Sequence, residues 1–355
     1  MNDELKARRD RCTDSFGGHG LVSSAALLAS IPADTAVDFY GDGGVVAELE
    51  GHVAELLGKP AAVFLPSGTM AQAATLRVHA DARLSRTVLW HPQCHLDVHE
   101  DRAYARLHDL TGRPVGDRHR LLTLDDLAAV PEPFAALLLE LPQRALGGRL
   151  PRWDELVAQT RWARERGAAV HLDGARLWEA AAGYERPAAD VAALFDTVYV
   201  SFYKGIGALP GCCVAGPTAD VDEVREWRHR LGGRLYALWP SAASALSLLA
   251  AAVADMPARM AHTRAIAAAL AGVPSVRAVP DPPQTPMLDF LLSTTADTYM
   301  ANARRLADDK RFWVWPRPAT TDDPAVVRVQ LEVGSATMRH DPVFIAEILE
   351  SLTLA

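Results

Sequence analysis

Apolar positions follow two different periods along most of the chain. Between residues 45 and 59 (VVAELEGHVAELLGK) they recur at helical spacing, and residues 69–81 repeat that pattern. Short apolar runs separate such helices: AAVFLP (61–66), RTVLW (86–90), FAALLLEL (134–141), AAVHLD (168–173) and DTVYVS (196–201). Strands that alternate with helices predict a mostly parallel sheet with helices on both faces.

The two ends of the chain have a different pattern. Residues 1–30 are polar and then glycine-rich, with one short helix candidate, SSAALLAS (23–30). After about residue 245 the chain is alanine-rich and helical, and a smaller α+β pattern follows, with apolar runs at 275–280, 286–293, 311–316 and 326–333 and helices at 296–309 and 342–352. We therefore expect an N-terminal arm (1–30), a large domain (31–245) and a small C-terminal α+β domain (246–355).

Composition narrows the class of protein. The chain has 355 residues, of which 49% are hydrophobic, so it can bury a sizeable core. A net charge of −8 disfavours nucleic-acid binding, which needs a basic face, and leaves small molecules as the expected partners. The four cysteines form no CxxC pair, and MNDELKARRD has no apolar core of a secretory signal, so we expect a cytoplasmic protein.

One uncharged stretch of twenty residues, 235–254 (LYALWPSAASALSLLAAAVA), reaches the length of a membrane span. It contains Pro240, three serines and many alanines. We interpret it as a buried helix, and we expect no membrane association.

Candidate chemistry lies where three of the predicted strands end. The strand AAVFLP leads into Ser67-Gly68-Thr69, after which a helix begins. A small turn at a helix N-terminus offers free N–H groups to a phosphate, although a plain helix cap has the same sequence. Ligands of open parallel sheets bind outside the carboxyl ends of the strands, which is where this turn is expected.

The other two groups are an acid and a lysine. The strand AAVHLD ends in Asp173, which can hold a ring nitrogen protonated or cap the next helix. DTVYVS leads to Lys204, which is followed by glycines and can become a nucleophile if it is desolvated; otherwise it is an ordinary exposed lysine. Together, a phosphate cradle, an acid and a lysine are the parts of a site for pyridoxal 5'-phosphate (PLP).

The sequence also resembles a known family. Five segments are similar to the L-threonine aldolase group of the β-eliminating lyase superfamily, which are fold type I PLP enzymes: residues 40–72, 94–100, 140–151, 171–181 and 201–216. SGTM, HLDGAR and KGIGA are the most specific parts. The resemblance implies a three-layer α/β/α PLP-dependent transferase-like large domain, a homodimer or homotetramer, and cleavage of a β-hydroxy-α-amino acid to glycine and an aldehyde.

The same resemblance implies roles for single residues. Lys204 would form the Schiff base with PLP, and Asp173 would pair with the pyridine nitrogen. His95 would stack on the ring and is the candidate base, with Glu100 at the following acidic position. The remaining roles are phosphate binding by Ser67, Gly68 and Thr69, substrate carboxylate binding by Arg176 and Arg328, and approach to the site by Tyr40 and Gly41.

This chain departs from the group at several positions. Glu140-Leu141-Pro142 replaces Glu-Asn-Thr, and residues 123–133 contain no histidine. Tyr236 replaces an arginine that reaches a neighbouring subunit's phosphate, with Arg234 nearby, and Glu332 replaces a histidine. These changes concern substrate handling, so β-elimination, other Cα–Cβ chemistry, transamination and a non-catalytic PLP-fold protein stay open as alternatives.

Two other patterns suggest different sites. His91, His95 and His99 recur every four residues and on one helix could hold zinc, but Pro92 interrupts them and no HExxH motif is present. KGIGALPG has the wrong glycine spacing for a dinucleotide loop. We therefore predict no metal site and PLP as the cofactor.

Overall fold

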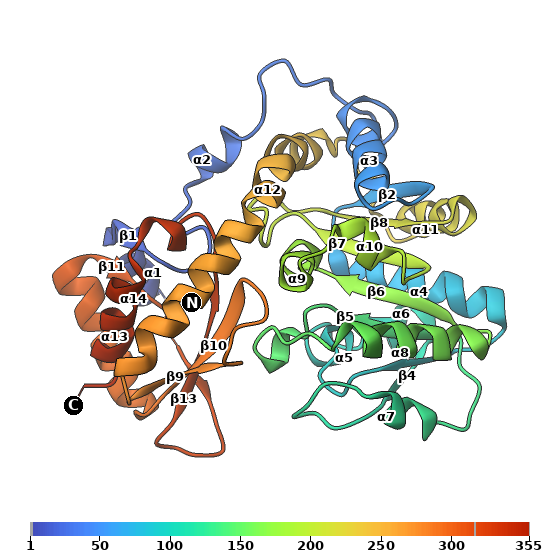
Figure 1. Ribbon diagram of the computed structural model, residues 1–355. Coiled ribbons are helices and arrows are strands. Elements are labelled where there is room, and N and C mark those ends of the chain that lie inside the picture. Colours follow the sequence, from blue (N-terminus) through green and yellow to red (C-terminus); the bar gives the residue numbers. More distant parts are fainter. Residues whose placement is uncertain (1–2, 316, 355) are drawn as a thin grey trace. The chain divides into compact units, whose positions relative to one another are not determined.

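The computed structural model describes residues 3–315 and 317–354 (Figure 1). The described residues form two compact units. The larger comprises residues 25–146 and 150–254, and the smaller comprises residues 3–24, 147–149 and 255–354. Of the N-terminal arm that the sequence suggested (1–30), residues 3–24 belong to the smaller unit, where β1 (Asp14–Ser15) pairs in parallel with β11 (Phe312–Trp313), and residues 25–30 belong to the larger unit.

A seven-stranded sheet lies at the centre of the larger unit, in the order β2-β8-β7-β6-β5-β3-β4. Strand β8 is antiparallel to both of its neighbours, whereas the other pairs are parallel. Its strands are β2 (Ala61–Leu65), β3 (Thr87–Trp90), β4 (Thr111–Pro114), β5 (Ala136–Glu140), β6 (Ala169–Gly174), β7 (Thr197–Ser201) and β8 (Cys212–Gly216). The predicted mostly parallel sheet is thus confirmed, with one antiparallel strand added.

Helices cover both faces of this sheet (Figure 1). Helix α4 packs beside α11 on one face, and α8 lies against β5 and β6 on the other. The helices, of which α2 begins at the boundary between the units, are α2 (Ser24–Leu28), α3 (Gly44–Leu56), α4 (Gly68–Arg83), α5 (His95–Val98), α6 (Ala103–His108), α7 (Leu124–Ala128), α8 (Trp153–Glu165), α9 (Leu177–Tyr184), α10 (Ala188–Ala192) and α11 (Thr218–Arg230), with a 3-10 turn at Arg144–Leu146. The larger unit is therefore a three-layer α/β/α structure.

The smaller unit is built on a four-stranded antiparallel sheet in the order β12-β13-β10-β9. Its strands are β9 (Val276–Val279), β10 (Met287–Leu292), β12 (Ala319–Thr320) and β13 (Val327–Glu332); its helices are α1 (Asp3–Arg11), α13 (Ala296–Lys310) and α14 (Pro342–Ser351), with 3-10 turns at Leu270–Gly272 and Thr337–Arg339. An apolar core of Phe16, Leu288, Phe290, Val329 and Ile345 holds it together. Of the predicted strand 311–316, only Phe312–Trp313 is a strand, and residue 316 lies outside the described residues.

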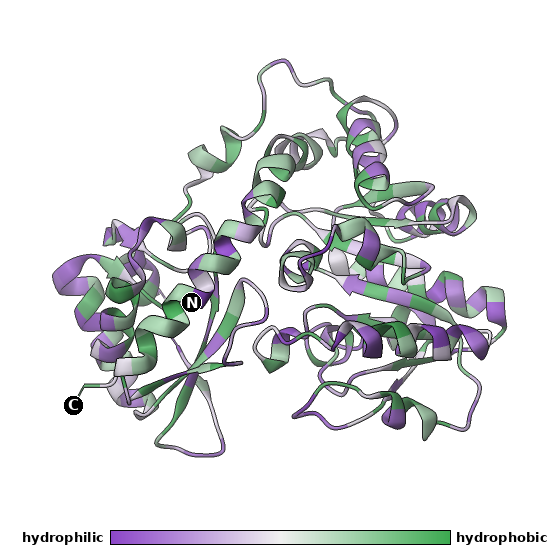
Figure 2. Ribbon diagram, viewed as in Figure 1, coloured by the Kyte–Doolittle hydropathy of each residue, from purple (hydrophilic) through white to green (hydrophobic). Residues whose placement is uncertain are grey.

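Helix α12 (Trp239–Ala269) contains most of the long uncharged stretch. Within the described residues it is the one helix long and apolar enough to cross a membrane, with a mean hydropathy of 1.4 over 18 residues, 39% of them buried. Figure 2 shows it in green apart from a hydrophilic section near its middle. There Asp255 pairs with buried Arg259 at 2.8 Å, which does not suit a hydrocarbon core. Burial of only 39% of the apolar window, however, does not match the buried helix that the sequence suggested.

Candidate active site

The turn between β2 and α4 presents a helix N-terminus without a side-chain cap. Ser67 is the N-cap residue of α4, but its side chain makes no capping hydrogen bond. A Cβ atom on Gly68 would lie 2.3 Å from the hydroxyl of Tyr199, so only glycine fits this close approach. The first backbone N–H groups of this 16-residue helix are therefore available to an anion, in line with a phosphate cradle rather than a plain cap.

Asp173 lies at the end of β6 and is only 3% exposed. Its Oδ1 accepts the backbone N–H of Ala175 at 3.1 Å, and the N-cap of the next helix, α9, is Arg176. The acid is therefore fixed by a local turn and is not the helix cap that the sequence left open.

Lys204 follows β7 and is half-buried, with its Nζ 5.7 Å from the centre of the Tyr203 ring. The sequence contains four lysines: Lys6, Lys59, Lys204 and Lys310. Among the described residues that line the pocket beside Asp173, Lys204 is the one lysine. The alternative of an ordinary exposed lysine does not describe this position.

These groups surround one pocket. It brings together the three strand-end groups that the sequence singled out, and its lining includes Ser67, Gly68, Thr69, Gln72, His95, Glu100, Asp173, Tyr199, Tyr203 and Lys204. The pocket offers a helix N-terminus for a phosphate, a buried carboxylate for a ring nitrogen and an amine for a carbonyl. The residues present therefore fit PLP.

His95 is held in place by a buried acid. Its Nδ1 lies 3.0 Å from Oε1 of Glu100, which fixes the orientation of the ring. The ring of His99 lies 5.0 Å from that of His95. Burial, followed by the charges of His95 and Arg144, lowers the pKa of His99. His99 is therefore neutral at physiological pH and can accept a proton.

A second space of about 850 Å³ shares several of these residues. Four residues line both spaces: His95, Asp173, Tyr203 and Lys204. Of the two spaces, only the second is lined by His99, Glu140, Arg144 and Arg176. Arg176 is buried, and it supplies a cation beside Lys204 for a substrate carboxylate. The structure thus brings Lys204, Asp173, His95 and Arg176 together.

Glu140 adds a second carboxyl next to Asp173. It ends β5 in register with Asp173 on β6 and accepts hydrogen bonds from Gln143 and from the backbone of Arg144, each at 3.1 Å. Burial, followed by the charge of Asp173, raises the pKa of Glu140 to about 7. The carboxyl of Glu140 therefore keeps its proton to a higher pH than an ordinary glutamate does.

Tyr40 and Arg328, the other predicted substrate residues, are not among the residues that line these two spaces. Arg328 is on β13 in the smaller unit, where its guanidinium is 3.6 Å from the buried carboxylate of Asp289. Tyr40 is 48% exposed, with a φ of 59° that is uncommon for a residue other than glycine. A role for either in binding substrate stays a prediction.

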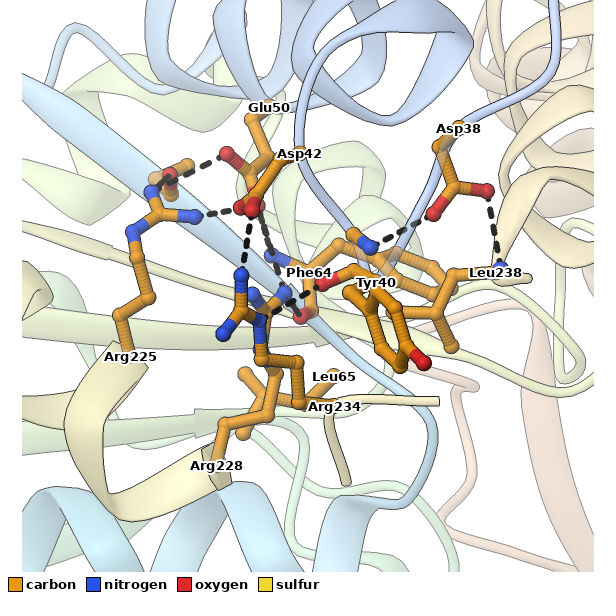
Figure 3. A network of polar contacts seen from close by, with 12 residues as sticks. Asp38, Tyr40, Asp42, Glu50, Phe64, Leu65, Arg225, Arg228, Arg234 and Leu238 are labelled. Carbon is orange, nitrogen blue, oxygen red and sulfur yellow. Dashed lines mark hydrogen bonds and ion pairs between the residues drawn. The ribbon is translucent and has the colours of Figure 1, made fainter. Parts of the chain in front are cut away.

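A polar network holds the Tyr40 loop (Figure 3). The buried carboxylate of Asp38 accepts the backbone N–H groups of Gly41, Leu238 and Trp239 at 2.6–2.9 Å. Arg234 donates to the Tyr40 carbonyl and to Asp42. The loop around Tyr40 is therefore tied to the start of α12.

The same network reaches β2. Glu50 accepts the backbone N–H of Phe64 at 2.7 Å and pairs with Arg225, while buried Arg228 donates to the Phe64 carbonyl at 2.9 Å (Figure 3). Phe64 lies three residues before Ser67. These contacts therefore fix the strand that delivers the helix N-terminus.

The zinc alternative does not match the described residues, which contain no group of three potential metal ligands. Helix α5 comprises His95–Val98 only, so the three histidines do not share one helix face. His91 instead bonds through Nε2 to the carbonyls of Asp117 and Arg120.

Several lining residues were not singled out from the sequence. Tyr203 could have been found, because it directly precedes Lys204. Gln72, Tyr199 and Arg144 carry no local signal, since each reaches the site only through the packing of α4, β7 and the turn after β5.

Comparison with known proteins agrees with this geometry. The chain matches the family of beta-eliminating lyases over residues 12–291. It is 36% identical over 220 residues to the aldolase vrtJ of Penicillium aethiopicum (58% of this chain, 55% of that protein) and 31% identical over 217 residues to the low specificity L-threonine aldolase of Escherichia coli strain K12 (59% and 64%). The aligned part thus spans less than two thirds of these relatives' lengths.

A solved structure matches more completely. The provisionally assigned aromatic amino acid beta-eliminating lyase/threonine aldolase of Exiguobacterium sp. 255-15 superposes with a TM-score of 0.91 at 34% identity, covering 99% of each chain. The larger unit has the three-layer α/β/α architecture of fold type I PLP-dependent enzymes. From the family match over most of its length and this similarity, we conclude that the chain belongs to the beta-eliminating lyase family.

Proposed function

We propose that this protein is a PLP-dependent carbon–carbon lyase that cleaves a β-hydroxy-α-amino acid to glycine and an aldehyde. The observation that carries the proposal is the joint placement of Lys204, Asp173 and the uncapped N-terminus of α4 around one pocket. Support for the reaction comes from the names of the relatives, which include an L-threonine aldolase and a second aldolase.

The cofactor would be held at four points. Backbone N–H groups of Gly68 and Thr69, with Ser67, would bind the phosphate, and Lys204 would bind the aldehyde carbon. Asp173 would keep the ring nitrogen protonated, and the ring of His95, held by Glu100, would lie against the ring face. When bound in this way, PLP supplies an electron sink for bond cleavage at Cα.

The protein's own residues would then place the substrate. Arg176 would bind the carboxylate, with Arg328 as a second proposed contact, and so orient the Cα–Cβ bond for cleavage. His95, or a water molecule that it holds, would remove the proton of the β-hydroxyl group. His99 offers a neutral imidazole in the same space. Loss of that proton lets the aldehyde leave.

Product analysis distinguishes this reaction from β-elimination, which the name of the Exiguobacterium relative also includes. Purified protein with PLP would be incubated with threonine, allo-threonine and phenylserine, with the Lys204→Ala variant as control. Glycine and the matching aldehyde from the wild type alone support aldol cleavage. Pyruvate or another keto acid with ammonia would instead indicate elimination, and an amino group passed to a keto acid would indicate transamination.

We further propose a cytoplasmic homodimer or homotetramer that binds no nucleic acid and no membrane. Three exposed aromatic side chains support self-association of that surface: the ring of Tyr236 lies 5.7 Å from that of Phe39 and 5.4 Å from that of Tyr40. Sedimentation at several concentrations would measure the assembly state.

A further inference from the structure

Four buried side chains form a continuous chain of hydrogen bonds in the larger unit. Gln72 Oε1 lies 2.9 Å from His171 Nε2, His171 Nδ1 lies 2.8 Å from Thr197 Oγ1, and that oxygen lies 2.7 Å from His79 Nε2. Each of the four residues is at most 2% exposed. Gln72 also lines the pocket beside Gly68, Asp173 and Lys204, so the chain ends at the candidate site.

These hydrogen bonds connect α4, β6 and β7, the elements that carry the candidate site. Gln72 and His79 lie two turns apart on α4, which begins with the proposed phosphate cradle. His171 lies two residues before Asp173 on β6, and Thr197 begins β7, which leads to Lys204. Because side chains two residues apart on a strand point to the same face, His171 and Asp173 face α4 together.

The protonation states of the two histidines determine which group donates and which accepts in each of these hydrogen bonds. Burial lowers the pKa of both His79 and His171 to about 3, so both rings are neutral at physiological pH. A neutral imidazole has one donor and one acceptor nitrogen. Since the Gln72 oxygen accepts, His171 carries its proton on Nε2 and accepts at Nδ1. Thr197 then gives its only proton to His171, and its oxygen accepts from Nε2 of His79.

This direction determines how the Gln72 carboxamide is presented. Its oxygen is engaged by His171, and among the hydrogen bonds of the described residues it takes part through that oxygen alone. Its NH2 group is the other branch of the same planar amide. The wall of the pocket beside Asp173 therefore gains a neutral donor rather than an acceptor.

We propose that Gln72 is a cofactor-binding residue whose NH2 group donates to the anionic cofactor, and that His171, Thr197 and His79 are positioning residues that fix its orientation. The identity of the cofactor rests on the proposed function, whereas the histidine protonation states do not. Thr197 and His79 are not among the residues that line the pocket, so they act on the site only through Gln72.

Solid-state 15N NMR of the histidine-labelled full-length protein tests the chain directly. In the wild type, we expect two neutral histidines with the proton on Nε2 that do not titrate between about pH 5 and 8. Variants His79→Gln and His171→Gln assign the two signals. Thr197→Val would disturb both signals, and Thr197→Ser would restore them. If both rings carried the proton on Nδ1, the hydrogen bonds would run in the opposite direction, and the proposal would be overturned. Titration of either ring in this pH range would also overturn it.

Titration with PLP tests the role of Gln72. Gln72→Glu keeps an oxygen for His171 but replaces the donor with an acceptor, so it should weaken PLP binding about tenfold or more while the histidine signals persist. Thr197→Val should weaken binding by less, and Thr197→Ser should bind like the wild type. Gln72→Glu with unchanged affinity for PLP would contradict the assignment. Absence of any lysine-dependent PLP band in the wild type would instead count against the proposed function, and the NMR result would still stand.

Discussion

At the scale of single residues, Glu140 and Asp173 show how neighbouring strands set the chemistry of a site. They occupy the same register on β5 and β6, and burial with the nearby Asp173 charge raises the pKa of Glu140 from 4.5 to about 7. Between these values the unfolded chain has released the Glu140 proton while the folded chain keeps it. The folded state therefore loses stability as pH rises from about 4.5 to 7.

The variant Glu140→Gln removes this pH dependence. Without PLP, we expect the melting temperature of the variant relative to that of the wild type to increase as pH rises from about 4.5 to 8. Parallel melting curves across this range would contradict the assignment. Thermal unfolding by circular dichroism at a series of pH values measures the difference.

Asp173 carries a separate prediction. Asp173→Asn keeps an oxygen for the Ala175 backbone N–H but removes the charge that would hold a ring nitrogen protonated. We expect kcat to fall by about 100-fold or more while PLP still attaches to Lys204. Steady-state kinetics and the visible absorbance of the purified variant check the two parts. A variant with full activity would show that Asp173 has no electronic role.

At the scale of elements, the N-terminus of α4 depends on one glycine. A Cβ at Gly68 would meet Tyr199 at 2.3 Å, whereas one at Gly51, in α3, would meet nothing within 4 Å. Gly68→Ala should therefore weaken PLP binding by about tenfold or more, since the helix end must shift. Gly51→Ala, the matched control, should leave binding unchanged and add about 0.5–1 kcal/mol of stability. If the wild type and both variants bound PLP with equal affinity, the proposed phosphate cradle would not depend on Gly68.

The Tyr40 loop depends on one carboxylate. Asp38→Ala leaves three backbone N–H groups without their acceptor, and we expect a loss of about 2–4 kcal/mol in the free energy of unfolding. Asp42 lies in the same loop, and Asp42→Ala removes only its exposed ion pair with Arg234. This change should lower the free energy of unfolding by about 1 kcal/mol or less. Urea unfolding followed by tryptophan fluorescence compares the two. Similar losses would mean that Asp38 does not anchor the loop.

Most elements of the sheet could be predicted from the sequence, because apolar runs of four to eight residues between amphipathic helices are typical of buried strands. Two strands were missed. β4 (Thr111–Pro114) is polar, contains Gly112 and lies at the edge of the sheet, where one side needs no partner. β8 (Cys212–Gly216) directly follows the glycine-rich lysine segment, and its antiparallel direction depends on the whole sheet order.

The candidate site could be predicted only in part, for a related reason. Ser67, Asp173 and Lys204 follow strands in the sequence, so their convergence follows from a parallel sheet. Glu140 was noted only as the first residue of a segment that resembles the family, and no role was predicted for it, because its effect requires β5 to lie next to β6. The proposed roles of Gln72 and His171 depend on a hydrogen bond between residues that are 99 positions apart, which no local sequence pattern predicts.

At the scale of the whole molecule, the small number of lysines leaves few alternatives to Lys204 as the residue that binds the cofactor. Of the four lysines, Lys6 and Lys310 belong to the smaller unit, and Lys59 and Lys204 to the larger. Burial lowers the pKa of Lys59, which donates to the Phe195 carbonyl at 2.6 Å, so Lys59 is the one plausible competitor for an aldehyde. Lys204 lies in the pocket and Lys59 does not.

The most direct measurement is reduction of the PLP-loaded protein with borohydride, followed by proteolysis and peptide mass spectrometry. We predict one stable pyridoxyl adduct, on the peptide that contains Lys204, in the wild type and in Lys59→Arg. The adduct should be absent from Lys204→Ala. An adduct on Lys59, or none in the wild type, would contradict the claim that Lys204 binds the cofactor.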